Sequence, residues 1–132
     1  MVARPTEYEE QCMFFDYVRI KANNDHRYKM VSSSQNGASL RGGAAAYYGL
    51  LKAGFSNGFP DISCLVPVGK HHGLFIEMKR KPNTPSKDQR DWLDRLNNLG
   101  YLAVVAWSAE DAIRILDAYL FTRGQPHDAQ EP

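Results

Sequence analysis

Apolar side chains recur at helical spacing in three stretches of this 132-residue chain. Each stretch follows a pair that caps helices, a Ser or Thr followed three positions later by Glu, Gln or Asp. The pairs are Thr6–Glu9, Ser86–Gln89 and Ser108–Asp111. The pattern predicts helices over residues 7–21, 87–99 and 109–121, and a weaker helix over 44–52 that ends before Gly54.

Four shorter apolar segments have the composition or the alternation typical of β-strands. They are residues 28–31, 61–66, 74–79 and 101–107. The second and third are separated by a short irregular stretch, which suits an antiparallel hairpin. The last is apolar throughout, as in a strand covered on both faces. A loop rich in Ser, Asn and Gly is expected over 32–43.

The order helix, strand, helix, strand, strand, helix, strand, helix predicts an α/β fold with a mixed sheet flanked by helices. One domain is expected over residues 1–121, because this length suits a single core. A frayed tail is expected over 122–132.

Composition narrows the possible functions without selecting one. Hydrophobic residues make up 43% of the chain and charged residues 23%, as in globular domains. Residues 1–11 lack the apolar run of a signal peptide and no stretch approaches a membrane span, so we expect a cytoplasmic protein, in the host cytoplasm if phage-encoded, with no membrane partner. The formal net charge is +1, so contact with nucleic acid must come from a local patch. We expect Cys12 and Cys64 to stay reduced.

Two carboxylates and a lysine stand out in the predicted hairpin. Side chains alternate along a strand, so Glu77 and Lys79 share one side of 74–79, and the hairpin brings Asp61 towards Glu77. Hard divalent cations select such oxygen ligands. An ordinary ion pair on a half-exposed strand explains the same three residues equally well.

The segment Gly58-Phe59-Pro60-Asp61, the apolar run into Glu77-Met78-Lys79 and the capped helix after Ser86 give a more specific pattern. In this order they resemble the VRR-NUC (virus-type replication-repair nuclease) family of the PD-(D/E)XK nuclease superfamily, which implies a restriction-endonuclease-like core. By this resemblance, Asp61, Glu77 and the Met78 backbone carbonyl are ligands of Mg²⁺ or Mn²⁺, and Lys79 is the catalytic lysine. No small-molecule cofactor is implied.

The resemblance also implies an acidic residue on the first helix and a glutamine near the active site. Glu7 best matches the spacing to Gln11, while Glu10 lies on the same side of the helix and stays open. Glu9 serves the capping box. Gln89 matches the family glutamine, and its place in a capping box accounts for it equally well.

Basic residues bracket the proposed site and are expected to bind DNA phosphates without reading base sequence. A solvated strand end is the other interpretation of the charges at 80–81. The expected contacts are Arg41, Lys52, Arg80, Lys81, Lys87 and Arg90.

Together these features predict a metal-dependent DNA endonuclease. The resemblance implies branched substrates such as Holliday junctions or flaps, as arise in DNA repair, and a homodimer, because paired cuts suit two-fold symmetry. Tyr47, Tyr48, Phe55 and Phe59 would line a dimer interface or belong to the core. The alternative function is a catalytically silent DNA-binding or scaffold module with the same fold.

Overall fold

A computed structural model of the protein describes residues 3–34 and 43–121. Within these ranges a four-stranded sheet is flanked by helices, and one short 3₁₀ helix precedes the first strand. The elements are α1 (Glu7–Ala22), η1 (His26–Met30), β1 (Val31–Ser33), α2 (Gly43–Lys52), β2 (Ile62–Cys64), β3 (Leu74–Met78), α3 (Lys87–Asn98), β4 (Leu102–Ala106) and α4 (Ala109–Leu120).

The sheet is mixed, as the sequence predicts. Its strands lie in the order β1-β2-β3-β4, in which β1, β2 and β3 pair antiparallel and β3 pairs parallel with β4. The predicted hairpin is therefore confirmed, with Ile62 opposite Ile76. A parallel pair needs a crossover connection, and α3 supplies it between β3 and β4.

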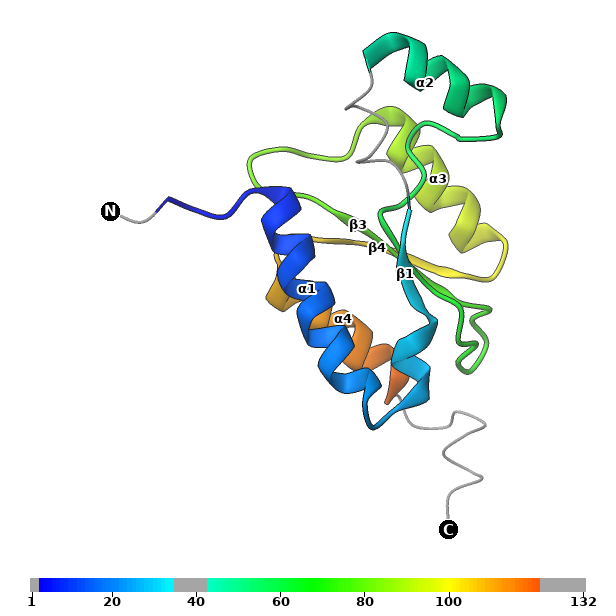
Figure 1. Ribbon diagram of the computed structural model, residues 1–132. Helices are drawn as coiled ribbons and strands as arrows, with labels where there is room; N and C mark the ends of the chain where they lie inside the picture. The colour runs from blue at the N-terminus through cyan, green and yellow to red at the C-terminus, as the bar shows by residue number, and fades with distance from the viewer. Residues whose placement is uncertain (1–2, 35–42, 122–132) are drawn as a thin grey trace.

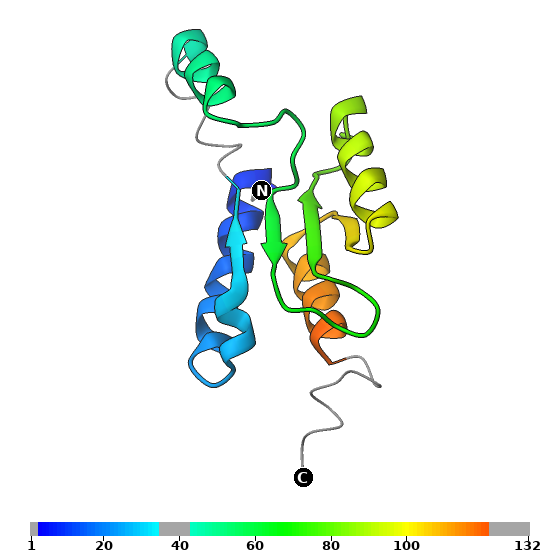
Figure 2. The ribbon, with the colours of Figure 1, turned by 90° about the vertical axis from the view of Figure 1, so that its right-hand side faces the viewer.

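The helices cover the sheet from both sides. In Figures 1 and 2, α1 and α4 lie against one face and α3 against the other. The larger core, between the sheet and α1 and α4, contains Phe14, Tyr28, Ile76 and Leu116, all 0% exposed. A smaller core under α3 contains Phe75, Leu93, Leu96 and Ala103.

Every residue of β3 is buried, so the interpretation of this strand as half-exposed is wrong. Alternation predicted which residues share a face, but not that α3 closes over the second face. Phe75 packs into the smaller core there, two residues before Glu77. Glu77 thus lies inside the protein, at the end of a strand that is covered on both sides.

The predicted strand over 28–31 is also wrong, because residues His26–Met30 form the 3₁₀ helix and the strand begins at Val31. The Asp25 carboxylate starts this turn by accepting hydrogen bonds from the Arg27 backbone N–H and guanidinium. Tyr28 is then buried, and its hydroxyl donates to Asp117 at 2.5 Å. A tertiary contact to α4 therefore overrides the local strand propensity.

The predicted helix starts are confirmed. Thr6 with Glu9 and Ser86 with Gln89 form reciprocal capping boxes, and the Ser108 hydroxyl accepts from the Asp111 backbone N–H. The thiols of Cys12 and Cys64 are both free, as expected. In the ranges that the structure describes, no helix combines the length and apolarity needed to cross a membrane.

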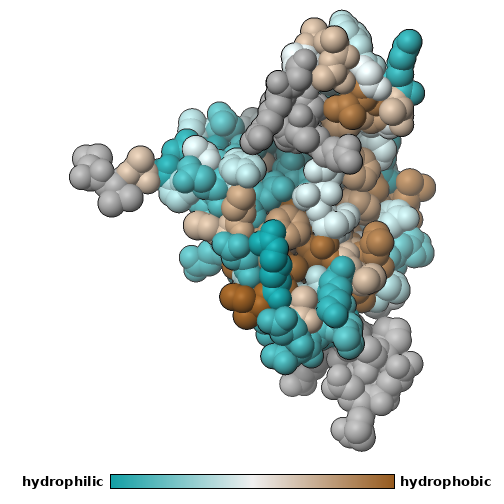
Figure 3. Space-filling model, in the orientation of Figure 1, coloured by the Kyte–Doolittle hydropathy of each residue, from teal (hydrophilic) through white to brown (hydrophobic). Residues whose placement is uncertain are grey.

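Helix α2 differs from the others because none of its residues, all of them described, is buried. It lies beyond the end of the strands (Figures 1 and 2), and the face in Figure 3 shows brown and tan groups beside teal ones at this end of the molecule. The predicted loop over 32–43 and the predicted tail over 122–132 fall partly or wholly outside the described residues; Ser32 and Ser33 belong to β1.

The backbone at Gly58 lies against the first turn of α3. Its φ of +82° is left-handed, and a Cβ there would stand 2.6 Å from the Asp88 carbonyl carbon and 2.7 Å from the Gln89 nitrogen. Only glycine allows this approach. Gly58 therefore allows the segment before β2 to lie close to the Asp88 and Gln89 backbone in the first turn of α3.

Gly58→Ala is expected to destabilise the protein much more than Gly69→Ala. Both positions have a positive φ, which costs an L-residue about 1–2 kcal/mol, but a Cβ at Gly69 would meet nothing within 4 Å. The clash at Gly58 should add about 1–3 kcal/mol. Urea unfolding measures both variants, and equal losses would contradict the close approach to α3.

Candidate active site

The hairpin register brings Asp61 and Glu77 together. Ile62 pairs with Ile76, so one step outward on each strand places Asp61 beside Glu77, at the end of the hairpin away from its turn. The Asp61 Oδ2 accepts a hydrogen bond of 2.8 Å from the Met78 backbone N–H. This bond fixes the Asp61 carboxylate against β3, so the predicted convergence of the two acids is present.

Glu77 is 2% exposed, and its two oxygens have different surroundings. Oε2 accepts a hydrogen bond of 3.2 Å from the Gln89 side-chain amide. Oε1 is buried and has no hydrogen-bond partner among the described residues. Leaving a buried acceptor unsatisfied costs about 1–3 kcal/mol, so this atom needs an explanation in function.

Burial raises the pKa of the Glu77 carboxyl well above the usual range, and the neighbouring Asp61 carboxyl raises it further. The Lys79 ammonium opposes this shift, and the Glu7 carboxylate adds to it. The main cause is desolvation, which disfavours the charged form. Two acids in one dry site thus repel each other unless a proton or a cation lies between them.

The oxygens at this site fit a hard divalent cation. Asp61 and Glu77 offer carboxylates, Oε1 of Glu77 lacks a donor, and the Met78 carbonyl belongs to the residue between Glu77 and Lys79. In the described parts of the chain, no group of three or more His, Cys, Asp or Glu side chains is placed to hold a metal. Two carboxylates and a backbone carbonyl are ligands that suit Mg²⁺ or Mn²⁺, which can also bind substrate oxygens. They suit Zn²⁺ less well, because zinc prefers nitrogen and sulfur ligands.

Lys79 leaves the end of β3, where its backbone N–H donates to the Ala106 carbonyl at 2.9 Å. It makes no ion pair with any residue in the described ranges, so the interpretation of Lys79 and the acids as an ordinary ion pair is wrong. Its positive charge still acts on Glu77 by lowering the pKa. The Lys79 charge therefore acts on Glu77 without a close ion pair in the described residues.

The two candidates on α1 have different surroundings. The Glu10 Oε1 accepts a hydrogen bond of 2.8 Å from the Ala109 backbone N–H, so this carboxylate caps the amino terminus of α4. The Glu7 charge contributes to the raised pKa of Glu77, so this carboxylate acts on the site electrostatically. Glu9 is held by the capping box with Thr6. Glu10 therefore has a structural partner on α4, and Glu7 is the α1 acid whose charge acts on Glu77.

Gln89 is both a capping-box residue and a neighbour of the candidate site, the two interpretations that the sequence supported equally. Its Oε1 accepts from the Ser86 backbone N–H at 2.8 Å, which completes the capping box. Its Nε2 donates to Glu77. Because the cap fixes one end of the amide, the other end is aimed at Glu77. The start of α3 therefore orients a carboxylate of the candidate site.

The predicted DNA-binding residues differ in their exposure and in whether their side chains already have partners. Lys52 and Lys81 are exposed, and the Lys81 ammonium lies 5.4 Å from the centre of the Trp107 ring. Lys87 pairs with Asp91 at 2.8 Å, and Arg90 donates to the Pro85 carbonyl. Exposed ion pairs of this kind are weak, so phosphate can compete for Lys87. Arg41 lies outside the described residues.

Two basic residues have features that the sequence did not indicate. Arg80 is half-buried, and its buried Nε has no hydrogen-bond partner among the described residues. Arg4 donates to the Lys81 carbonyl at 2.6 Å, which brings the amino-terminal segment to the basic run. No motif marks Arg4, because its partner lies far along the chain. Both residues lie beside the strand end that carries Lys79.

Comparisons with known proteins agree with this geometry. The model of the VRR-NUC domain family matches residues 26–110, which include Asp61, Glu77, Lys79 and Gln89. A solved structure described as a VRR_NUC domain protein is similar over 90% of this chain and 91% of that chain, with a TM-score of 0.73 and 22% sequence identity. No curated protein matches. The structural likeness confirms the predicted fold, a mixed sheet flanked by helices, consistent with restriction-endonuclease-like proteins.

Glu77→Gln is expected to stabilise the metal-free protein. The raised pKa means that the folded state keeps a proton which the unfolded chain releases above about pH 4.5. Wild-type stability should therefore fall as pH rises from that value through the raised pKa, by at most about 1.4 kcal/mol per pH unit, and the variant should lack this loss. Thermal unfolding in EDTA at pH 5 and pH 8 measures it.

The matched control is Glu110→Gln, which neutralises an exposed carboxylate on α4. It should show no comparable gain at the higher pH. If the advantage of Glu77→Gln over wild type did not grow with pH, the carboxyl would not be held protonated in the folded state.

Proposed function

The chain belongs to the VRR-NUC family of nucleases, and from that premise we propose that it is an endonuclease that hydrolyses phosphodiester bonds of DNA with Mg²⁺ or Mn²⁺. One observation carries the proposal. Glu77 is buried beside Asp61 with one oxygen that has no partner in the described structure, so it is placed at a cost in stability that folding alone does not explain.

Asp61, Glu77 and the Met78 carbonyl are the residues that would hold the ion. When bound, the ion supplies a Lewis acid, a bound water of lowered pKa and a charge that balances the leaving oxygen. The protein prepares this site: the Met78 N–H fixes Asp61, and the Gln89 amide orients Glu77. Glu7 adds negative charge from α1, which strengthens cation binding.

Lys79 contributes its positive charge on the substrate side of the site. Because it has no carboxylate partner within ion-pair distance in the described structure, its ammonium can bind a phosphate oxygen or orient the attacking water. It also favours the ionised form of Glu77, the form that binds a cation. In this proposal the Lys79 charge acts both on the substrate phosphate and on the ionisation of the Glu77 carboxyl.

Branched DNA, such as flaps or Holliday junctions, is the proposed substrate class. A net charge of +1 gives little general attraction to duplex DNA. The proposed phosphate contacts are the local charges at Lys52, Arg80 and Lys81 and, after release from Asp91, Lys87, and these bind backbone without reading sequence. Selection would then rest on DNA shape.

A homodimer is also proposed; paired cuts at a junction would require two sites, whereas a single cut at a flap or fork would not. The exposed, apolar surface of α2 supports the homodimer, and Tyr48 is 65% exposed there. Phe59 is less suited to an interface, because it already packs on Phe75 and Trp92. Light scattering at micromolar protein distinguishes a dimer mass from that of a monomer.

A catalytically silent binding module is the second candidate. It explains the basic residues and the fold, but it gives no reason for a buried carboxylate with one oxygen that lacks a partner in the part of the chain that the structure describes. Wild-type protein that binds flap, fork and junction DNA yet never nicks it with Mg²⁺ or Mn²⁺ would favour this module over the nuclease.

Glu77→Ala and Lys79→Gln are each expected to lower metal-dependent cleavage by at least about 100-fold, because each removes charge stabilisation from the site. Cleavage of a fluorescent branched substrate measures the loss. The control is Lys70→Gln, an exposed lysine in the distant turn of the hairpin, which should cleave normally. Full activity in a folded Glu77→Ala protein would refute the site.

Glu7→Gln and Glu10→Gln should separate the two acids of α1. Loss of the Glu7 charge beside Glu77 should lower activity about 10- to 100-fold with little change in stability. Loss of the Glu10 cap on α4 should lower stability by about 1 kcal/mol while the active site persists. The reverse outcome, measured by cleavage and urea unfolding, would assign the role to Glu10.

A further inference from the structure

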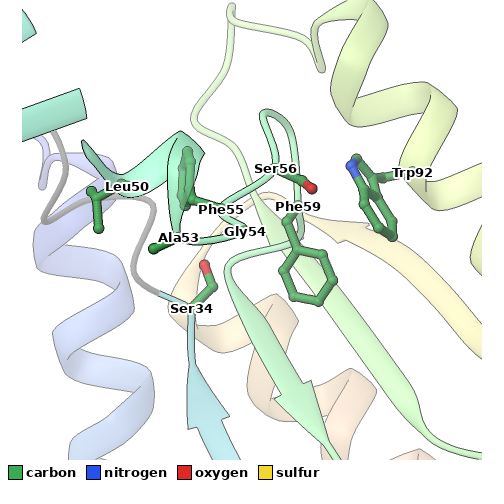
Figure 4. Close-up of a pocket in the computed structure, with 8 residues that line it drawn as sticks. All are labelled: Ser34, Leu50, Ala53, Gly54, Phe55, Ser56, Phe59 and Trp92. Atoms are coloured by element: carbon green, nitrogen blue, oxygen red, sulfur yellow. The ribbon is translucent and has the colours of Figure 1, made fainter. Parts of the chain in front are cut away.

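An aromatic cleft opens beside the candidate active site. Its volume is about 430 Å³, and its walls include Leu50, Phe55, Phe59 and Trp92, with the hydroxyl groups of Ser34 and Ser56 at its edge. Figure 4 shows Phe59 and Trp92 at one end of the cleft and Leu50 and Phe55 at the other. Phe55, Phe59 and Trp92 are all half-buried, so the cleft presents aromatic surface to solvent.

The aromatic wall is held in place by the core beneath it. The Phe59 ring meets Trp92 edge-to-face with centroids 5.0 Å apart, and it meets Phe75 in the same way at 5.7 Å. Phe75 is buried under α3. A wall anchored in this way is rigid, so a planar ligand could stack on it without ordering the side chains first.

The same residues tie the cleft to the site. Phe59 lies two residues before Asp61, and two residues of extended chain span at most about 7 Å. Trp92 lies one turn along α3 from Gln89, whose amide binds Glu77. The aromatic wall and the site residues Asp61 and Gln89 are therefore built from neighbouring positions on the same two segments, which places the cleft beside the candidate active site.

The charges around the cleft suit a nucleotide. The exposed Arg95 guanidinium lies 5.8 Å from the centre of the Trp92 ring, and the exposed Lys52 precedes Ala53, which lines the cleft. Aromatic faces with flanking cations are the usual means of holding single-stranded nucleic acid, because every base has a stacking face. An uncharged aliphatic ligand, or a helix without acidic side chains, would gain nothing from these cations.

Resting on the proposed nuclease function, we propose that this cleft seats an unpaired nucleobase of the DNA strand whose phosphate lies at Asp61 and Glu77. The base stacks on the aromatic wall, and the Ser34 and Ser56 hydroxyls face its polar edge. A paired base cannot enter, because it remains stacked in the duplex. The substrate class narrows to DNA with unpaired nucleotides next to the cut, such as flaps and forks, over fully paired junctions.

Abasic scanning tests, without requiring cleavage, whether the cleft, which we call the base seat, binds a base. Full-length wild-type protein is mixed with a labelled fork in Ca²⁺ buffer, and binding is measured by fluorescence anisotropy as single nucleotides near the branch are replaced in turn by an abasic analogue. Loss of the seated base should weaken binding about 5- to 100-fold at one or two adjacent positions only.

Trp92→Leu should weaken binding to the intact fork by a similar factor and remove the penalty at those abasic positions. Phe121→Leu is the matched control: this aromatic residue is 52% exposed at the end of α4 and does not line the cleft, so its abasic penalty should match that of wild type. If Trp92→Leu does not fold, Phe55→Leu gives the same readout from the opposite wall of the cleft.

The outcomes separate this inference from the proposed function. A penalty that persists in both cleft variants, or that appears at no position in wild type, overturns the base seat even if the protein cuts DNA. A penalty that the cleft variants remove supports the seat even if no cleavage is found with Mg²⁺ or Mn²⁺. A change of mass in Trp92→Leu with the penalties unchanged would assign the cleft to a second copy of the chain and also overturn the seat.

Discussion

Burial of the Glu77 carboxylate is the constraint on which the rest of the site depends. This carboxylate is 2% exposed, and its Oε1 has no hydrogen-bond partner among the described residues, which is unfavourable in a folded protein; the Asp61 carboxylate beside it raises the cost of ionising Glu77. The surrounding structure compensates for this in part, through the Gln89 amide and the charge of Lys79. The cost that remains uncompensated is the cost that the proposed binding of a cation would remove. A fold that satisfied both oxygens of Glu77 would be more stable and less able to bind metal.

Backbone geometry on both sides of the sheet places the groups that act on Glu77. The antiparallel pairing of β2 with β3 fixes Asp61, and the crossover helix α3 returns over the other face with Gln89 in its first turn. Gly58 permits these two parts to touch, since a side chain there would meet the α3 backbone. The two acids, Asp61 and Glu77, and the residue that orients Glu77 therefore come from three segments whose positions depend on one another.

Local signals in the sequence predicted much of this arrangement. Capping boxes, strand alternation and the hairpin spacing act over a few residues, and the structure has the helix starts and the β2–β3 pairing that they predict. Contacts between distant residues could not be predicted in the same way. The bond from Ala109 to Glu10, the burial of Tyr28 against Asp117 and the second cover over β3 all join segments far apart in the chain. They concern, in turn, the choice between Glu7 and Glu10, the predicted strand over 28–31 and the predicted exposure of one face of 74–79.

Weak long-range attraction to DNA makes contacts near the cut more important for this protein. With a net charge of +1, the chain cannot rely on a broad basic surface, and some of its local cations already have partners in the folded state. Stacking on Trp92 and Phe59 does not depend on net charge and is screened little by salt, unlike phosphate contacts. Discrimination between paired and unpaired DNA can then arise in the cleft beside the carboxylates. A small domain without a base-reading element can in this way select DNA structure from a single rigid aromatic wall.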